Sequence, residues 1–273
     1  MNRQIAVNSN TYHGFALEDA LEGIAAAGFR YIELTATKGW TEHVFPNHSF
    51  ARLAHVRSRM EQKGLQAIGL SGHCNLMDAG RLPDFYENIQ LASFFGCRHI
   101  LSSIGEAHLR DEVRAGEDDL LRNLDAVAGQ LEKHNLHLAL ETHGEHGSGK
   151  AIGRLLARLA SPRIGLCYDT ANVIYYSGEN MPADFQAALP AITYIHLKDK
   201  AGRPEEWNFP ALGQGRIDFP VLFAMLDQGK NASPFSVEIE FTERGPDDLA
   251  AVHQAVRDSF AYLSRAGFDV RTG

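Results

Sequence analysis

Four acidic or histidine residues stand at or near the ends of short apolar runs in the second half of the chain. They are Glu141 in HLALE, Asp169 in IGLCYD, His196 in ITYIH and Glu238 in FSVEIE. Three carboxylates and a neutral imidazole suit Mn²⁺, Mg²⁺, Co²⁺ or Zn²⁺, because a divalent cation removes the repulsion between the like charges. If the four runs end together, the sequence predicts one divalent metal ion per chain, with Mn²⁺ favoured.

Each of these residues also has a purely structural interpretation. Asp169 is suited to cap a following helix, and His196 to a hydrogen-bonded position in the core. The two glutamates are suited to ion pairs with Lys198 or Arg203. The position of all four at the ends of consecutive runs favours a metal site over four separate explanations.

A metal at this point would support the removal of a proton next to a carbonyl group. The cation stabilises the negative charge of the resulting enediolate. Carboxylates on both faces of the substrate would allow epimerisation, and a single engaged base would allow aldose–ketose isomerisation. Departure of a β-hydroxyl group from the same enediolate would give dehydration. The residues themselves leave these three reactions open.

The apolar runs that carry these residues belong to a series that extends along the whole chain. The runs cover residues 4–9, 31–35, 65–71, 99–103, 137–141, 164–169, 192–196 and 235–240. Each has the length of a strand and is bounded by turn residues. Stretches with helical spacing lie between them, at 17–27, 50–63, 83–95, 117–134, 148–160, 184–189, 218–228 and 247–266.

Strict alternation of eight strands and eight helices predicts an α/β fold, a (β/α)8 TIM barrel that spans residues 1–273 as a single domain. The repeat of about 34 residues is close to the length of one βα unit. An open doubly wound sheet is disfavoured, because no glycine-rich fingerprint follows the first run.

In a barrel of this kind the functional groups come from the carboxyl ends of the strands. Alternation along the strands points Glu141, Asp169 and Glu238 into the mouth of the barrel. Glu240 faces the same way, two residues beyond Glu238. Glu33 also faces inward from the second run, where Arg30 or Lys38 is a suitable partner for it.

The motifs around these residues resemble those of a known family. The segments ALETHG, CYDTAN, YIHLKDK, LGQGRIDFPVL and SVEIE are together similar to the sugar phosphate isomerase/epimerase family, within the xylose-isomerase-like TIM barrel superfamily. The resemblance implies that Glu141, Asp169, His196 and Glu238 hold one divalent metal. It favours Glu238 over Glu240 as the fourth ligand. In the 3-epimerase branch, the two metal-bound glutamates, here Glu141 and Glu238, exchange a proton with the substrate.

The resemblance therefore implies a metal-dependent isomerase or epimerase of a small sugar, keto-sugar or sugar derivative. Two departures favour a dehydratase as the alternative. Asn172 stands where ketose 3-epimerases usually carry a histidine, and the HLKD segment is more similar to inosose dehydratase. Lys198 is suited to protonate a departing hydroxyl, or to pair with Asp199 or Glu238. Arg203 is suited to bind an acidic or phosphorylated group.

Further side chains follow the strands and are candidates for contact with the substrate. His73 follows the third run, His143 follows Glu141 by two residues, and Asn172 follows the sixth run. Trp207 lies in the long loop after the seventh run and is suited to cover a sugar face or to anchor that loop. Residues 147–150 (GSGK) offer backbone N–H groups to an anion, although without the spacing of a phosphate-binding loop.

Composition limits the partners of the protein. Thirty-four acidic against twenty-six basic residues give a net charge of −8, which argues against a nucleic-acid binder, including a repair endonuclease of the same superfamily. No apolar stretch reaches the length of a membrane span, and the first residues lack the apolar segment of a signal peptide. Three scattered cysteines predict no disulfide framework. We therefore expect a cytoplasmic protein with a small carbohydrate substrate; a homo-oligomer is compatible with the sequence.

Overall fold

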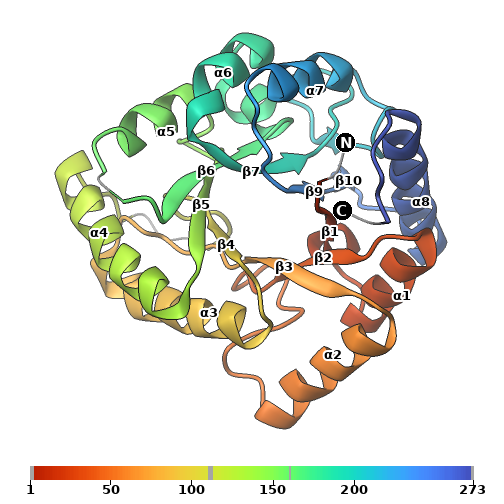
Figure 1. Ribbon diagram of the computed structural model, residues 1–273, viewed down its shortest axis with the longest axis horizontal. Coiled ribbons are helices and arrows are strands. Elements are labelled where there is room, and N and C mark those ends of the chain that lie inside the picture. Colours follow the sequence, from red (N-terminus) through yellow and green to blue (C-terminus); the bar gives the residue numbers. More distant parts are fainter. Residues whose placement is uncertain (1–2, 110–112, 160, 272–273) are drawn as a thin grey trace.

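The structure, a computed structural model, describes residues 3–109, 113–159 and 161–271. Eight parallel strands close into a central barrel, and helices surround it (Figure 1). In order around the barrel, the strands are β1 (Ile5–Asn8), β2 (Tyr31–Thr35), β3 (Gln66–Ser71), β4 (His99–Ser102), β5 (His137–Glu141), β6 (Ile164–Asp169), β7 (Ile192–Leu197) and β9 (Phe235–Val237). The predicted (β/α)8 barrel is confirmed.

The outer layer follows the predicted helices closely. It consists of α1 (Leu17–Ala27), α2 (Phe50–Gln62), α3 (Leu82–Phe94), α4 (Glu117–His134), α5 (Gly149–Leu156), α6 (Met181–Ala188), α7 (Phe219–Gln228) and α8 (Leu249–Arg265). Helix α5 ends before the predicted boundary at residue 160, which lies outside the described residues. Helix α6 begins three residues before the prediction, because the Asn180 side chain caps it by accepting from the N–H of Ala183.

The eighth strand is shorter than predicted, and this affects the site. Strand β9 ends at Val237, so Glu238 and Glu240 follow the strand and are not part of it. The Glu240 N–H donates to the carbonyl of Phe209 at 3.2 Å. The chain thereby leaves the barrel to form a small antiparallel pair between β8 (Asn208–Phe209) and β10 (Phe241–Thr242).

Alternation along the strands separates the two faces of the barrel as predicted. A small apolar layer fills the interior, formed by Leu101, Ala139, Cys167 and Tyr194. The intervening strand residues, such as Leu138 and Val237, pack with the helices in the larger outer core. Side chains therefore fill the interior of the barrel, and the polar groups at the strand ends lie above this layer.

The amino terminus of α5 does not offer free N–H groups to an external anion. The Asp184 carboxylate accepts from the N–H of Gly149 at 2.9 Å and from that of Lys150 at 3.0 Å. The Ser148 hydroxyl lies 2.9 Å from the same carboxylate. Asp184 thus occupies the N–H groups that the sequence of residues 147–150 offered to an anion.

The loop after β7 is held from within by Asp199. Its two carboxylate oxygens accept four backbone N–H groups at 2.8 to 3.2 Å, those of Lys200, Gly213, Gly215 and Ile217. A Cβ at Gly215 would lie 2.2 Å from Asp199 Oδ1, so the close approach requires glycine. The loop that carries Trp207 is therefore a fixed part of the structure.

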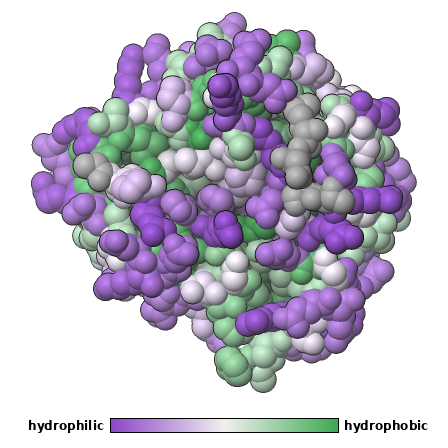
Figure 2. All heavy atoms as spheres, viewed as in Figure 1, coloured by the Kyte–Doolittle hydropathy of each residue, from purple (hydrophilic) through white to green (hydrophobic). Residues whose placement is uncertain are grey.

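Most large apolar side chains of the described residues are buried. Figure 2 shows hydrophobic residues at the tip of the molecule near the start of α2, where Phe50 is 75% exposed. Across the described ranges, none of the helices combines the length and the apolar character needed to cross a membrane.

We predict that replacing Asp199 by alanine loosens this loop and destabilises the fold. Four buried or half-buried N–H groups lose their acceptor, and we expect a loss of about 2–4 kcal/mol in the free energy of unfolding. Urea unfolding of Asp199→Ala measures it, with the exposed Asp247→Ala as the matched control. Equal unfolding midpoints in the two variants would contradict the role of Asp199.

Candidate metal centre

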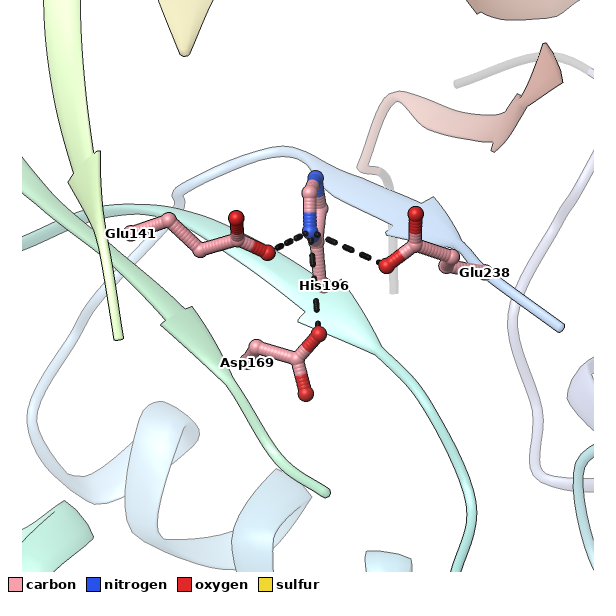
Figure 3. A group of neighbouring side chains, drawn as sticks. All are labelled: Glu141, Asp169, His196 and Glu238. Atoms are coloured by element: carbon pink, nitrogen blue, oxygen red, sulfur yellow. Dashed lines mark hydrogen bonds and ion pairs between the residues drawn. The ribbon is translucent and has the colours of Figure 1, made fainter. Parts of the chain in front are cut away.

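The four predicted ligands converge at the carboxyl end of the barrel. Glu141 ends β5, Asp169 ends β6, His196 lies in β7, and Glu238 follows β9. One ligand atom of each lies within 4.8 Å of the others, and all four side chains are buried. Figure 3 shows the three carboxylates arranged around one imidazole nitrogen.

The two nitrogens of His196 have different surroundings. Nδ1 faces Glu141 Oε1 at 2.7 Å, Glu238 Oε2 at 3.6 Å and Asp169 Oδ2 at 3.8 Å. Nε2 lies 3.1 Å from both carboxylate oxygens of Glu33. Because Nε2 donates its proton to Glu33, Nδ1 is the nitrogen available to a cation.

The two carboxylate oxygens of Asp169 have different surroundings. Its Oδ1 accepts the N–H groups of Ala171 and Asn172 at 2.9 and 2.8 Å, which caps the turn after β6. Its Oδ2 is buried, has no hydrogen-bond partner and faces the other ligands. A buried carboxylate oxygen without a donor is costly, and a cation in the cluster would satisfy it. The donor set therefore fits a divalent metal.

Glu141 is oriented by His73. The Ser103 N–H donates to His73 Nδ1 at 3.1 Å, so Nε2 carries the imidazole proton and faces Glu141 Oε2 at 3.3 Å. Burial lowers the pKa of His73 well below its usual value, which keeps the ring neutral. Burial also raises the pKa of Glu141.

Glu238 receives its donors from the first strand and from Lys198. The Asn8 and Asn10 side-chain amides both donate to Glu238 Oε1 at 3.1 Å. Lys198 Nζ lies 3.3 Å from Oε2. Burial opposes the charged carboxylate, but the charge of Lys198 acts together with that of His196 and with the hydrogen bonds from Asn10 and Lys198, and these lower the pKa of Glu238 to about 2. The sequence pattern did not point to either asparagine, although both stand at the end of the first apolar run.

Glu240 lies beside the cluster and has different partners. Its carboxylate pairs with Lys198 and accepts from the Asn10 amide at 3.0 Å. Lys198 also donates to Asn172 Oδ1 at 3.3 Å. The expected pairing of Lys198 with Glu238 is present, whereas Asp199, the other expected partner, directs its carboxylate to the loop N–H groups.

Glu33 is buried and belongs to the hydrogen-bond network around His196 and Glu238. Neither of its expected partners, Arg30 and Lys38, pairs with it. It accepts from the Asn8 amide at 3.0 Å as well as from His196. Lys38 instead lies 3.8 Å from Asp84 on the surface. Asn8 thus bridges Glu33 and Glu238, which links the partner of the imidazole to the fourth ligand.

Aromatic and imidazole rings form the rim above the ligands. His143 Nε2 lies 3.2 Å from the Tyr176 hydroxyl, and His108 lies against Trp40 with the rings nearly parallel. Burial lowers the pKa of His143 well below its usual value and that of His108 to about 4. His108 and Trp40 were not predicted, because they lie in long loops with no strand pattern to place them.

Arg203 is not brought to this group. Its guanidinium is exposed and lies 3.4 Å from Glu205, and it is not among the residues that line the space above the ligands. Trp207, from the same loop, does line that space. The loop turns between the two residues, so only one of them faces the barrel.

The fold and the cluster together define a TIM barrel with a buried carboxylate and histidine centre at the carboxyl ends of its strands. Residues 21–265 match the xylose isomerase-like TIM barrel family, so the chain belongs to this family.

Known proteins resemble the chain in sequence and in fold. A curated Escherichia coli (strain K12) protein described as putative L-ribulose-5-phosphate 3-epimerase SgbU is 29% identical over 114 residues, which cover 40% of this chain and 39% of that protein. The structure of D-psicose 3-epimerase in the presence of D-fructose has a TM-score of 0.76 at 14% identity and covers 99% of this chain and 100% of its own. A xylose isomerase-like protein from Mycobacterium smegmatis in complex with magnesium has a TM-score of 0.72 at 16% identity and covers 97% of both chains. The structural likenesses establish the fold.

We predict that Glu33→Gln weakens metal binding. The neutral amide supports the Nε2 proton of His196 less than a carboxylate does, so we expect a loss of roughly 10–100-fold in metal affinity. Calorimetric titration with Mn²⁺ measures the affinity, and His196→Ala, which removes a ligand, should bind no stoichiometric ion. An unchanged affinity in Glu33→Gln would show that Glu33 has only a packing role.

We also predict that metal affinity rises with pH. Burial raises the pKa of Asp169 to about 8 and also raises that of Glu141, so protons compete with the cation at neutral pH. From about pH 6 to about pH 9 the protons are progressively lost and the affinity increases. Titration in buffers with different ionisation enthalpies counts the protons released. Binding without proton release would contradict this prediction.

Proposed function

We propose that the protein is a divalent-metal-dependent epimerase or isomerase of a small ketose or related keto-sugar. The observation that carries the proposal is the approach of Glu141 and Glu238 to His196 Nδ1 from opposite sides (Figure 3). Carboxylates on two sides of one point suit proton transfer on either face of a substrate carbon. The likeness to SgbU and to D-psicose 3-epimerase supports a sugar substrate.

Glu141, Asp169, His196 Nδ1 and Glu238 would hold the cation. When bound, it would balance the negative charge that develops on the substrate oxygens as a proton leaves the neighbouring carbon. Three oxygen donors and one nitrogen favour Mn²⁺ or Mg²⁺ over thiolate-seeking metals, and the magnesium complex of the M. smegmatis protein supports this choice.

The chain's own residues divide the remaining tasks. Glu141 has a raised pKa and is the better proton acceptor, whereas Glu238 stays ionised beside Lys198. The neutral imidazoles of His73 and His143 both border the space above the ligands, where they can hydrogen-bond substrate hydroxyls. Buried neutral donors of this kind suit an uncharged sugar better than an anion.

A specific observation supports elimination as a second candidate function. Lys198 is buried, is held beside Glu238 and Glu240, and borders the same space. Its ammonium group keeps the proton affinity of Glu238 low, which leaves Glu141 as the principal base. A single base together with a nearby ammonium donor suits loss of a β-hydroxyl group as water.

The proposal is tested by NMR in D₂O with Mg²⁺ and a panel of ketoses: D-fructose, D-psicose and L-ribulose. An epimerase or isomerase incorporates deuterium at the reacting carbon and forms a product of equal composition. Loss of water from a keto-sugar or keto-inositol would identify the dehydratase instead. Absence of both reactions across the panel and an added inosose would refute the proposed chemistry.

Glu238 and Glu240, which both follow β9, provide a matched pair of variants for the same assay. We expect Glu141→Gln and Glu238→Gln each to lower deuterium exchange by roughly 10²–10⁴-fold, because each removes a proton acceptor and a ligand. Glu240→Gln should keep substantial exchange, since Glu240 pairs with Lys198 outside the ligand set. The reverse order would move the fourth ligand to Glu240.

A further inference from the structure

A large cavity continues outward from the metal centre. This outer chamber has a volume of about 460 Å³, and its walls include Trp40, Trp207, Ile239 and Phe241. The inner space directly above the ligands measures only about 20 Å³, room for about one or two water molecules. The two adjoin, because Asn10, Trp40, Trp207 and Glu240 border both. Any sugar that reaches the ligands must therefore extend into the outer chamber.

Trp40 keeps the inner space narrow. Its ring stacks with His13 at 4.1 Å and with His108 at 4.7 Å, and its Nε1–H donates to Asn10 Oδ1 at 3.0 Å. Trp40 thus lies between the His13 and His108 rings and forms a wall that borders both the outer chamber and the inner space. Thr41 fastens this wall, because its hydroxyl lies 2.7 Å from His13 Nδ1 and donates to Asn10 at 2.8 Å.

The opposite wall is equally fixed. Trp207 makes edge-on contacts with Tyr175 and Phe209, at centroid distances of 5.6 and 4.9 Å. The buried Lys200 ammonium donates to three carbonyls of the same loop, at Ala201, Arg203 and Glu206. A chamber whose walls are held before binding loses little entropy when a ligand enters.

Phe241 contributes a strained position to the chamber. Its φ of 58° is a left-handed conformation that aromatic residues rarely adopt, and pairing of β10 with β8 holds it there. Strain of this kind is retained at functional sites where the surrounding structure enforces it.

The charges in the chamber select against an anionic ligand. Arg244 is its one cationic lining residue among those described, and Glu243 and Glu240 also line it. Glu240 is paired with Lys198, and Glu243 offsets Arg244, so no net positive charge faces the cavity. The remaining walls are largely aromatic and aliphatic, with neutral polar groups from Asn10 and Thr11. A neutral ring fits this chemistry better than a phosphate.

We propose that the outer chamber binds a second ring attached to the reacting sugar, so that the substrate is a glycoside of a keto-sugar. This inference rests on the proposed function, since it assigns the reacting unit to the metal centre. The volume of the chamber is within the range of about 300–1,000 Å³ found for small-molecule sites. The second ring would lie between the Trp40 wall and Trp207.

Tryptophan fluorescence tests this directly, because the chain contains two tryptophans and both border the chamber. The probes are isomaltulose, in which glucose is linked to fructose, together with D-fructose and D-fructose 6-phosphate, each with Mg²⁺ present. We expect isomaltulose to bind at least about tenfold more tightly than fructose, in line with one added ring contact. Equal affinities, tightest binding of the phosphate, or no binding of any probe would overturn the inference.

Four variants locate the binding. Calorimetry of Trp207→Ala should show isomaltulose affinity reduced to that of fructose, and Trp207→Phe should recover part of it. Phe50→Ala, an exposed aromatic on α2, is the matched control and should change nothing. Arg244→Ala should leave isomaltulose binding within about twofold. If it abolished that binding, the chamber would be an anion site.

The assay separates failure of this inference from failure of the proposed function. Fluorescence reports binding whether or not the sugar reacts. Suppose that isomaltulose binds more tightly than fructose but no ketose or ketose glycoside exchanges deuterium. This result would refute the proposed function and would still support binding of a second ring in the outer chamber. Deuterium exchange in free ketoses, with no higher affinity for isomaltulose than for fructose, would support the proposed function and refute the inference that the substrate is a glycoside.

Discussion

Repulsion between buried carboxylates is the constraint on which the centre of this protein depends. Glu33, Glu141, Asp169 and Glu238 lie at the same end of one barrel, withdrawn from water. Carboxylates this close cannot all be ionised without positive partners. Lys198 supplies one such partner beside Glu238 and Asp169, and the Oδ2 of Asp169, which accepts no hydrogen bond, faces the point where a cation would complete the balance.

The hydrogen bonds around the cluster determine which atoms remain available. Glu33 occupies Nε2 of His196, backbone N–H groups occupy Oδ1 of Asp169, and asparagine amides occupy Oε1 of Glu238. Each ligand is left with one atom directed to a common point. Side chains held in this way lose little freedom when a metal binds, and their partners also contribute to metal affinity.

The loops add a second level of organisation through buried charges that do not face the carboxylate and histidine cluster. Asp199 and Lys200 are buried within the loop after β7 and satisfy its backbone groups. Asp184 does the same for the start of α5. Because backbone groups in long loops lack the partners that helices and strands provide, these internal ions let irregular segments pack as firmly as regular ones. The walls around the site are thereby held before any ligand arrives.

The sequence by itself determined the barrel and the residues that converge in it. Period-two alternation in short runs and period-3.6 spacing between them are local properties, and a closed parallel barrel brings all the carboxyl ends to one side. Glu141, Asp169, His196 and Glu238 were therefore found from their positions along the chain.

Only the tertiary structure decided what surrounds them. The choice of Nδ1 on His196, the link from Asn8 to Glu33 and Glu238, the exposure of Arg203 and the wall formed by Trp40 arise from contacts between segments far apart in the chain. Loops have no repeating pattern that predicts their direction, and the facing of each loop side chain follows from packing against the rest of the fold.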